Sequence, residues 1–158
     1  MADLSNWAFP PEMQPKSEDA RFDLEEALDS VVLLRAEVPE DAFTAGILGT
    51  ERTGNGVVIR DDGLVLTIGY LVQEASEIQV TGASGKPISA TLVGYDYESG
   101  FGLIRTAIPL PVKPIELGDS SELAERQQVL VAGYGGYKAA TAAVVVSASS
   151  AVTAAPAT

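Results

Sequence analysis

The sequence contains no cysteine and no histidine among its 158 residues. The absence of cysteine excludes a disulfide, a reactive thiolate and a cysteine-based zinc site. The absence of histidine removes the usual general base of hydrolases and leaves only carboxylates to hold a metal. Asp61 and Asp62 are adjacent, but they precede Gly63 in a turn of the kind where aspartate is common. We therefore expect neither a metal nor a cofactor.

A leader and a long apolar run are also missing from the sequence. The first residues, MADLSNWAFPPEMQPKSED, have neither the basic start nor the apolar centre of a secretory signal. The nearest candidate for a membrane span, residues 139–158, is uncharged but consists only of alanine, valine, threonine, serine and proline. Such a stretch is too weakly apolar to insert into a bilayer. These features predict a cytoplasmic protein with no membrane partner.

Positive charge is scarce, and the formal net charge is −12. Residues 1–45 hold 11 acidic and 3 basic side chains, whereas the remainder holds 11 and 7. An acidic N-terminal arm disfavours nucleic acid and anionic membrane surfaces, since both repel it. We expect no nucleic-acid partner, and solubility or spacing is the simpler role for the arm.

Aromatic residues make up only 6% of the chain, whereas glycine (15) and proline (9) are well represented. This composition favours short strands and turns over a helical bundle. A short helix is expected over residues 17–29, and prolines 109, 111 and 114 predict a linker. Residues 45–51 and 56–60 are expected to be two strands joined by a tight turn at Gly54-Asn55. The other expected strands are 30–38, 64–68, 76–82, 86–95, 101–106, 127–133 and 140–147. Strands at this spacing predict an all-β sandwich or barrel.

Residues 54–72, GNGVVIRDDGLVLTIGYLV, carry the most informative pattern. They resemble the opening of HtrA/Deg-type serine proteases of the trypsin-like superfamily, in which a G-S-G-V-I-I strand leads to D-G-x-I-L-T-x-x-H-V-V. Thr67 stands in the place of that threonine, and Tyr70 stands where the family has its catalytic histidine. The resemblance continues through four further segments: EIQV at 77–80, ATLVGYD at 90–96, LGDS at 117–120 and VLVAGYGG at 129–136.

The resemblance implies a degenerate catalytic triad. The family's D-L-A-L-L-K segment aligns with Gly100 to Arg105, so Gly100 replaces the aspartate that orients the histidine. The family's G-N-S-G-G-P stretch has no counterpart in this sequence, which ends 22 residues after Gly136. Serines 147, 149 and 150 have no glycine beside them to build an oxyanion hole. A serine needs a base within hydrogen-bond reach, and Tyr70, with a reference pKa of about 10, is a poor one.

The fold that this resemblance implies is a trypsin-type first β-barrel, followed by the opening strands of a second. The expected divisions are an acidic extension with a short helix (1–29), the first barrel (30–115), the start of the second barrel (116–147) and a low-complexity tail (148–158). An incomplete second barrel would expose the inward faces of its strands. We predict a binding edge there for a polypeptide or another subunit, self-association included. Its expected members are Val129, Val131, Val144 and Val146.

The leading hypothesis is an inactive protease homologue that acts, if at all, by binding a polypeptide or a subunit. The alternatives are an N-terminal fragment of a longer serine endopeptidase or pseudoprotease, and a gene fragment without a selected function. Two local questions also stay open. Tyr70 is either a ligand-binding or modified tyrosine or a partly buried filler of the vacated histidine position. Asp96-Tyr97-Glu98 either offers a carboxylate near Tyr70 or is a solvated turn. The GYGGYK run at 133–138 does not match a phosphate loop in spacing and precedes a strand.

Overall fold

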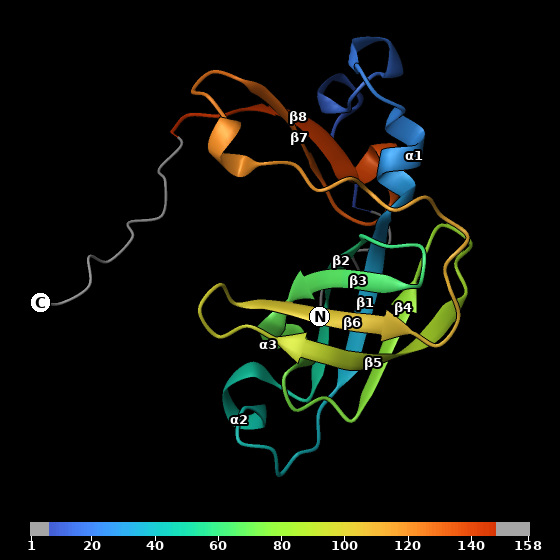
Figure 1. Cartoon of the computed structure of the whole chain (residues 1–158), viewed down its shortest axis with the longest axis vertical. Coiled ribbons are helices and arrows are strands. Elements are labelled where there is room, and N and C mark those ends of the chain that lie inside the picture. The colour runs from blue at the N-terminus through green and yellow to red at the C-terminus, as the bar shows by residue number, and fades with distance from the viewer. Residues whose placement is uncertain (1–6, 148–158) are drawn as a thin grey trace, which may run out of the picture.

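The computed structural model describes residues 7–147, and its centre is a closed antiparallel barrel (Figure 1). The strand order around the barrel is β1-β2-β3-β6-β5-β4, which confirms the expected all-β architecture. Short helices connect or flank the strands. The barrel strands are β1 (Val31–Glu37), β2 (Glu51–Val58), β3 (Leu64–Ile68), β4 (Glu77–Thr81), β5 (Pro87–Tyr95) and β6 (Phe101–Thr106). The α-helices are α1 (Leu24–Asp29), α2 (Ala45–Leu48) and α3 (Gly69–Val72), and the 3₁₀ turns are η2 (Pro11–Met13), η3 (Ser17–Asp19), η4 (Ser120–Glu122) and η5 (Gly136–Ala139).

Alternation of apolar residues along the strands fills the interior of the barrel. Val32, Leu34 and Ala36 of β1 are buried at every second position, which is the period of a strand with one buried face. Helix α3 closes one end with Leu71 and Val72. The cluster comprises Val32, Leu34, Ala36, Val58, Val65, Leu71, Val72, Ile78, Val80, Ile104 and Leu110. Burying side chains of this kind is worth roughly 1.5–3 kcal/mol each, so this cluster dominates the stability of the barrel.

A second, smaller unit pairs the C-terminal hairpin with the N-terminal arm. Strands β7 (Gln128–Ala132) and β8 (Ala140–Val144) form a two-stranded sheet. Leu24 and Leu28 of α1 pack with Ala140 of β8 in a separate buried cluster. The arm adds backbone and side-chain bonds: Phe9 N donates to Lys138 O at 2.9 Å, and Thr141 Oγ1 donates to Met13 O at 3.0 Å. In Figure 1 this unit lies beyond one end of the barrel, whereas α2 lies at the opposite end.

The β1–β2 region differs from the sequence-based expectation. Residues 45–48 form helix α2, and β2 runs without a turn through Gly54-Asn55, so the predicted strand over 45–51 and the predicted turn are wrong. Gly54 serves a different purpose, because a Cβ there would lie 2.4 Å from Leu71 Cδ1. A glycine within a strand can mark close packing as well as a turn.

Two other expectations need correction. The expected helix over 17–29 is shorter, because the Asp23 side chain accepts a hydrogen bond from Glu26 N at 3.0 Å and so caps a helix that begins at Leu24. The proline-rich segment after β6 has no helix or strand, but it is not a free linker. Leu110 is buried in the barrel core, and Ile115 N donates to Val58 O at 2.9 Å.

The four valines expected on the inward faces of the last two strands lie on different faces of the β7–β8 sheet. Val129 lies opposite Ala143 and Val131 opposite Thr141, whereas Val144 lies opposite Gln128. Since directly paired residues point to the same side of a sheet, Val129 and Val144 are on opposite faces. Val146 follows β8 beyond the paired residues and is 88% exposed. The N-terminal arm, which the sequence did not assign to this unit, supplies the apolar cover for Leu130 and Ala132.

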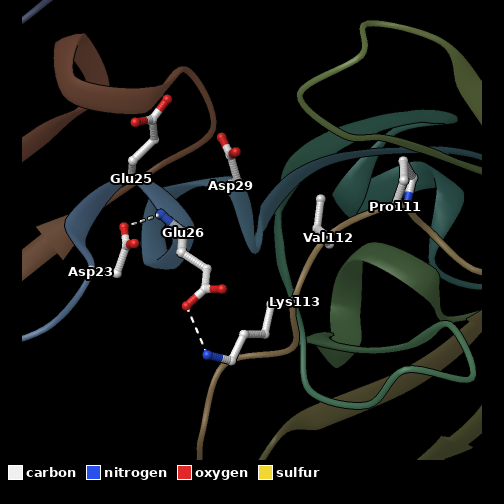
Figure 2. A pocket seen from close by; sticks show the side chains of 7 residues that line it. All are labelled: Asp23, Glu25, Glu26, Asp29, Pro111, Val112 and Lys113. Atoms are coloured by element: carbon white, nitrogen blue, oxygen red, sulfur yellow. Dashed lines mark hydrogen bonds and ion pairs between the residues drawn. The ribbon is translucent and has the colours of Figure 1, made fainter.

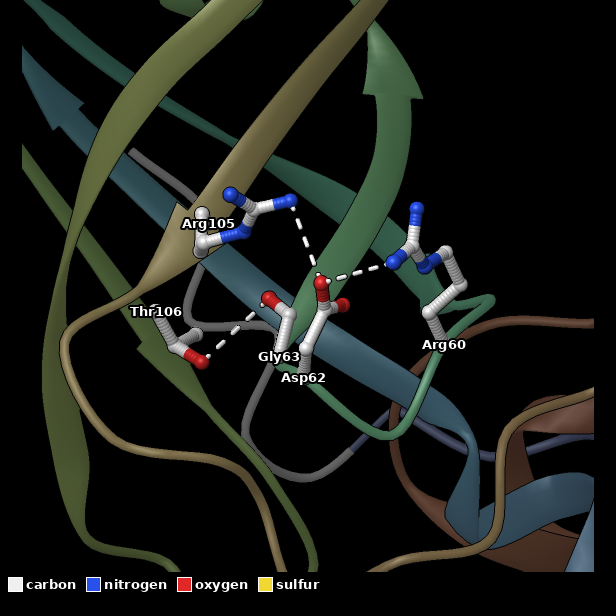
Figure 3. A network of polar contacts seen from close by, with 5 residues as sticks. All are labelled: Arg60, Asp62, Gly63, Arg105 and Thr106. Carbon is white, nitrogen blue, oxygen red and sulfur yellow. Dashed lines mark hydrogen bonds and ion pairs between the residues drawn. The ribbon is translucent and has the colours of Figure 1, made fainter.

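The β2–β3 turn and the end of β6 are joined by a polar network (Figure 3). Asp62 Oδ2 accepts from Arg60 Nη2 at 3.0 Å and from Arg105 Nη2 at 3.2 Å. Gly63 adopts φ of 82°, and its carbonyl accepts from the Thr106 hydroxyl at 3.3 Å. The Asp-Gly turn is therefore used structurally, and the adjacent aspartates take no part in a metal cluster among residues 7–147.

Candidate functional site

The structure brings the segments of Tyr70 and Gly100 together at one end of the barrel. Tyr70 is the second residue of α3, and Gly100 ends the turn between β5 and β6. Gly69 N donates to Gly100 O at 2.7 Å, which ties the two segments directly. In addition, Ile68 and Phe101 are cross-strand partners in β3 and β6. The two residues that the resemblance assigns to the triad positions are thus close neighbours in space, although 30 positions separate them in sequence.

Neither residue has the chemistry of a base with its orienting carboxylate. The Tyr70 side chain is 49% exposed, so it is only partly buried at its position. Gly100 has φ of 77°, and a Cβ built there would meet nothing within 4 Å. The site therefore presents a half-exposed phenol beside open space, with no side chain at position 100 to fill it.

Gly69 is required by packing at this site. A Cβ on Gly69 would lie 1.9 Å from Cε2 of Tyr95, so only glycine allows the Tyr95 ring to cover the start of α3. The Tyr95 ring also meets Tyr97 edge-on, with ring centroids 4.4 Å apart. Tyr97 itself is 81% exposed. Tyr95 at the end of β5 and Tyr97 in the β5–β6 turn thus place two aromatic rings beside the start of α3.

Arg52 connects α3 to the loop between β1 and β2. Its side chain is buried, and it donates to Tyr70 O at 2.6 Å, Gln73 O at 3.0 Å, Gly49 O at 3.2 Å and Thr44 Oγ1 at 2.8 Å. Tyr70 and Gln73 carbonyls lie at the end of a short helix, where carbonyl groups lack intrahelical partners. Sequence reasoning missed Arg52. Its only signal was its position in β2, in phase with buried Gly56 and Val58.

Glu74 completes this network from the loop after α3. Its carboxylate accepts from the backbone N–H groups of Phe43 and Thr44, at 3.2 and 2.8 Å, and from the Thr44 hydroxyl. These hydrogen bonds, the Thr44 hydroxyl first, hold the pKa of Glu74 below its ordinary value. Glu74 adopts φ of 60°, which costs a non-glycine residue strain and which often accompanies a functional constraint. The sequence gives no signal for this residue.

The Asp96-Tyr97-Glu98 turn is organised by its own first residue. Asp96 accepts from the Ser99 hydroxyl, from Glu98 N at 3.2 Å and from Ser99 N at 3.2 Å. The Ser99 hydroxyl is the main reason that the pKa of Asp96 lies below its ordinary value. Asp96 is therefore committed to its turn. It is a turn-forming residue rather than a partner for Tyr70, since no described hydrogen bond joins the two.

Two hollows of the described chain lie away from this site. One, of about 310 Å³, lies between α1 and the segment after β6 (Figure 2), where Glu26 accepts from Lys113 Nζ at 2.8 Å. That hydrogen bond raises the pKa of the Lys113 ammonium. A larger hollow, of about 1140 Å³, lies between the N-terminal arm and β7–β8. Among residues 7–147 no helix is long and apolar enough to cross a membrane.

The closed barrel, with the Tyr70 and Gly100 segments at one end, is the arrangement expected of a trypsin-like domain, and the comparisons agree. The family model described as "Trypsin-like peptidase domain" matches residues 54–156. The chain belongs to this family.

Relatives of the HtrA and Deg type match part of the chain. "Protease Do-like 1, chloroplastic" from Arabidopsis thaliana is 30% identical over 105 residues, which cover 65% of this chain and 24% of that protein. A "Probable periplasmic serine endoprotease DegP-like" from Hahella chejuensis is 34% identical over 84 residues, which cover 52% of this chain and 18% of that protein. "Serine protease HtrA-like" from Staphylococcus haemolyticus is 28% identical over 118 residues, which cover 69% of this chain and 18% of that protein. The chain thus spans a quarter or less of the length of these relatives.

Proposed function

We propose that this trypsin-like domain has no proteolytic activity of its own and acts by binding a polypeptide. The proposal depends on one observation. Tyr70 and Gly100, which the resemblance places at the base and its orienter, belong to segments that are joined by the 2.7 Å bond between Gly69 N and Gly100 O. The chain holds no histidine that could substitute. A phenol with a pKa near 10 is a poor acceptor for a serine proton at neutral pH.

The proposal applies equally to this domain within a longer protein. In the family that the chain resembles, the histidine and the aspartate both belong to the first barrel, and here that barrel is closed by β1 to β6. A nucleophilic serine supplied from elsewhere would still lack its base. Removing the base alone abolishes most of the rate enhancement of such a triad.

A restoration experiment tests the proposal. The full chain is compared with Tyr70→His and with the double variant Tyr70→His/Gly100→Asp in casein hydrolysis and in labelling by a fluorophosphonate probe. The space at position 100 is open, and aspartate tolerates its left-handed backbone better than most residues, so the double variant should fold. We expect no hydrolysis and no labelling from any of the three proteins.

The contrary results are specific. Saturable labelling of a serine in the unaltered chain would show a competent nucleophile and would refute the proposal. Amidase activity of the double variant above the buffer blank would show that only the base and the orienter were missing. Circular dichroism of each variant controls for folding.

A further inference from the structure

Large apolar side chains gather in the open at the end of the barrel where α3 lies. Three connections meet there: residues 38–50 between β1 and β2, residues 69–76 with α3, and residues 96–100 between β5 and β6. Phe43 is 88%, Ile47 84% and Tyr97 81% exposed, and the others are about half exposed. We call this set the α3-end surface: Phe43, Ile47, Ile68, Tyr70, Tyr97 and Phe101.

Contacts beneath the surface join the three connections into one. Arg52 bridges Thr44 Oγ1 and Tyr70 O, which links the first connection to α3. The bond from Gly69 N to Gly100 O links α3 to the β5–β6 turn. The exposed side chains therefore stand on one fixed base and not on three independent loops.

The loop that carries Phe43 and Ile47 is held firmly although its side chains point outward. Glu74 accepts from Phe43 N and Thr44 N, and it does so from a strained backbone with φ of 60°. Gly49 O accepts from Arg52. A loop fixed in this way presents its apolar side chains without the entropy loss that a mobile loop would suffer on binding. Exposed apolar groups that cluster on a rigid base are typical of an interaction surface.

The charged side chains of the three connections are all acidic, and the Arg52 cation beneath them is buried. The three connections hold five carboxylates, Glu40, Asp41, Glu74, Asp96 and Glu98, and no lysine or arginine. At the same end, Glu37 of β1 is paired with Glu51 of β2 and with Glu77 of β4. Like charges directly opposite one another in a sheet are unfavourable in the free protein. By contrast, the turns at the other end of the barrel mix Arg60 and Lys86 with Asp61 and Asp62.

We propose that the α3-end surface docks a polypeptide segment in which lysine or arginine stands beside large apolar side chains. The apolar groups would pack on Phe43, Ile47 and Tyr97, and the cations would face the carboxylates around them. This proposal deepens the proposed function, on which it depends for the class of ligand. A second copy of this acidic chain and an anionic membrane fit less well, because both would bring negative charge to the surface.

Three fluorescein-labelled peptides of equal length test the chemistry by fluorescence anisotropy with the full chain. The first alternates lysine with leucine and phenylalanine, the second has glutamate for each lysine, and the third has serine for each apolar residue. We expect saturable binding of the first, weakened by salt, and binding of the others at least about tenfold weaker. Equal binding of the first and third would overturn the proposal, as would no binding of the first.

Two pairs of variants locate the site. Phe43→Ser/Ile47→Ser should weaken binding of the first peptide at least about tenfold. Ile108 is 60% exposed at the other end of the barrel, and Ile108→Ser should change the affinity for this peptide less than about twofold. Asp41→Asn/Glu98→Gln should weaken binding more than Glu122→Gln/Glu125→Gln, which removes the same charge elsewhere. Equal effects within either pair would mean nonspecific attraction to an acidic protein and would overturn the proposal.

Two further readouts separate the outcomes. Sedimentation of the chain alone shows whether Phe43→Ser/Ile47→Ser abolishes a self-association, a result that would assign the surface to a second copy and refute the polypeptide ligand. Mass spectrometry of the first peptide after incubation reports cleavage. Cleavage would refute the proposed lack of activity but not the proposed docking surface. If the first peptide neither binds nor is cleaved, the docking surface alone is refuted.

Discussion

Replacing Arg52 by methionine should loosen the α3 end of the barrel more than any change of a surface charge. Methionine keeps an unbranched apolar stem but deletes the donors that reach Gly49 O, Tyr70 O, Gln73 O and Thr44 Oγ1. An intramolecular hydrogen bond contributes about 0.5–1.5 kcal/mol, and a buried acceptor left without a donor costs about 1–3 kcal/mol. Because the exposed end of the loop allows water to reach some of these oxygens, we expect a loss of about 3 kcal/mol.

Urea unfolding followed by circular dichroism measures this loss as a change in midpoint at constant slope. For a chain of this size about 3 kcal/mol corresponds to roughly 6–12 °C in melting temperature. Hydrogen exchange should also accelerate at the amides of Phe43 and Thr44, which the network holds. Arg35→Met, an exposed position on β1, is the matched control for the lost charge. A loss below about 1 kcal/mol with unchanged exchange would refute the role assigned to Arg52.

Three other perturbations test different parts of the same end. Gly69→Ala should lower the free energy of unfolding by about 1–3 kcal/mol, since its Cβ would lie 1.9 Å from the Tyr95 ring. Tyr95→Ala in the same chain should remove most of that cost, and additive losses in the double-mutant cycle would contradict the packing argument. Ile104→Ala, at a fully buried core position, should cost about 2–5 kcal/mol in urea unfolding, and a loss under about 1 kcal/mol would mean that the core can close around the gap. The Glu74 pKa is lowered from 4.5, so its contribution is fully present above that pH and is lost as the pH falls through the folded value. The protection factor of the Phe43 N–H, which takes account of the slower intrinsic exchange in acid, should therefore fall on acidification below pH 4.5 in the unaltered chain, and a Glu74→Gln chain that shows the same fall would exclude Glu74 as its source.

Sequence-based reasoning failed where a long-range contact decided the local structure. Residues 45–51 contain the apolar pair Ile47-Leu48 between two glycines, which is compatible with a strand. The chain nevertheless forms α2 over 45–48, where Glu74 and Arg52 hold the loop from outside it. Gly54 indicated a turn from its type alone, but its purpose is to make room for Leu71, 17 positions away. Neither partner can be identified from the segment itself.

The sequence by itself determined the all-β class, most barrel strands and the absence of histidine. Composition is read directly from the chain, and the alternation of apolar residues is set within each strand. Only the tertiary structure showed that the Gly100 segment is bonded to the start of α3, that Arg52 has four acceptors and that the N-terminal arm packs on β7–β8. Most of these contacts join residues far apart in the chain, and they exist only after the tertiary fold has fixed both partners. The apolar, acid-ringed α3 end is of this kind: its side chains are ordinary one by one, and closure of the barrel gathers them on one surface.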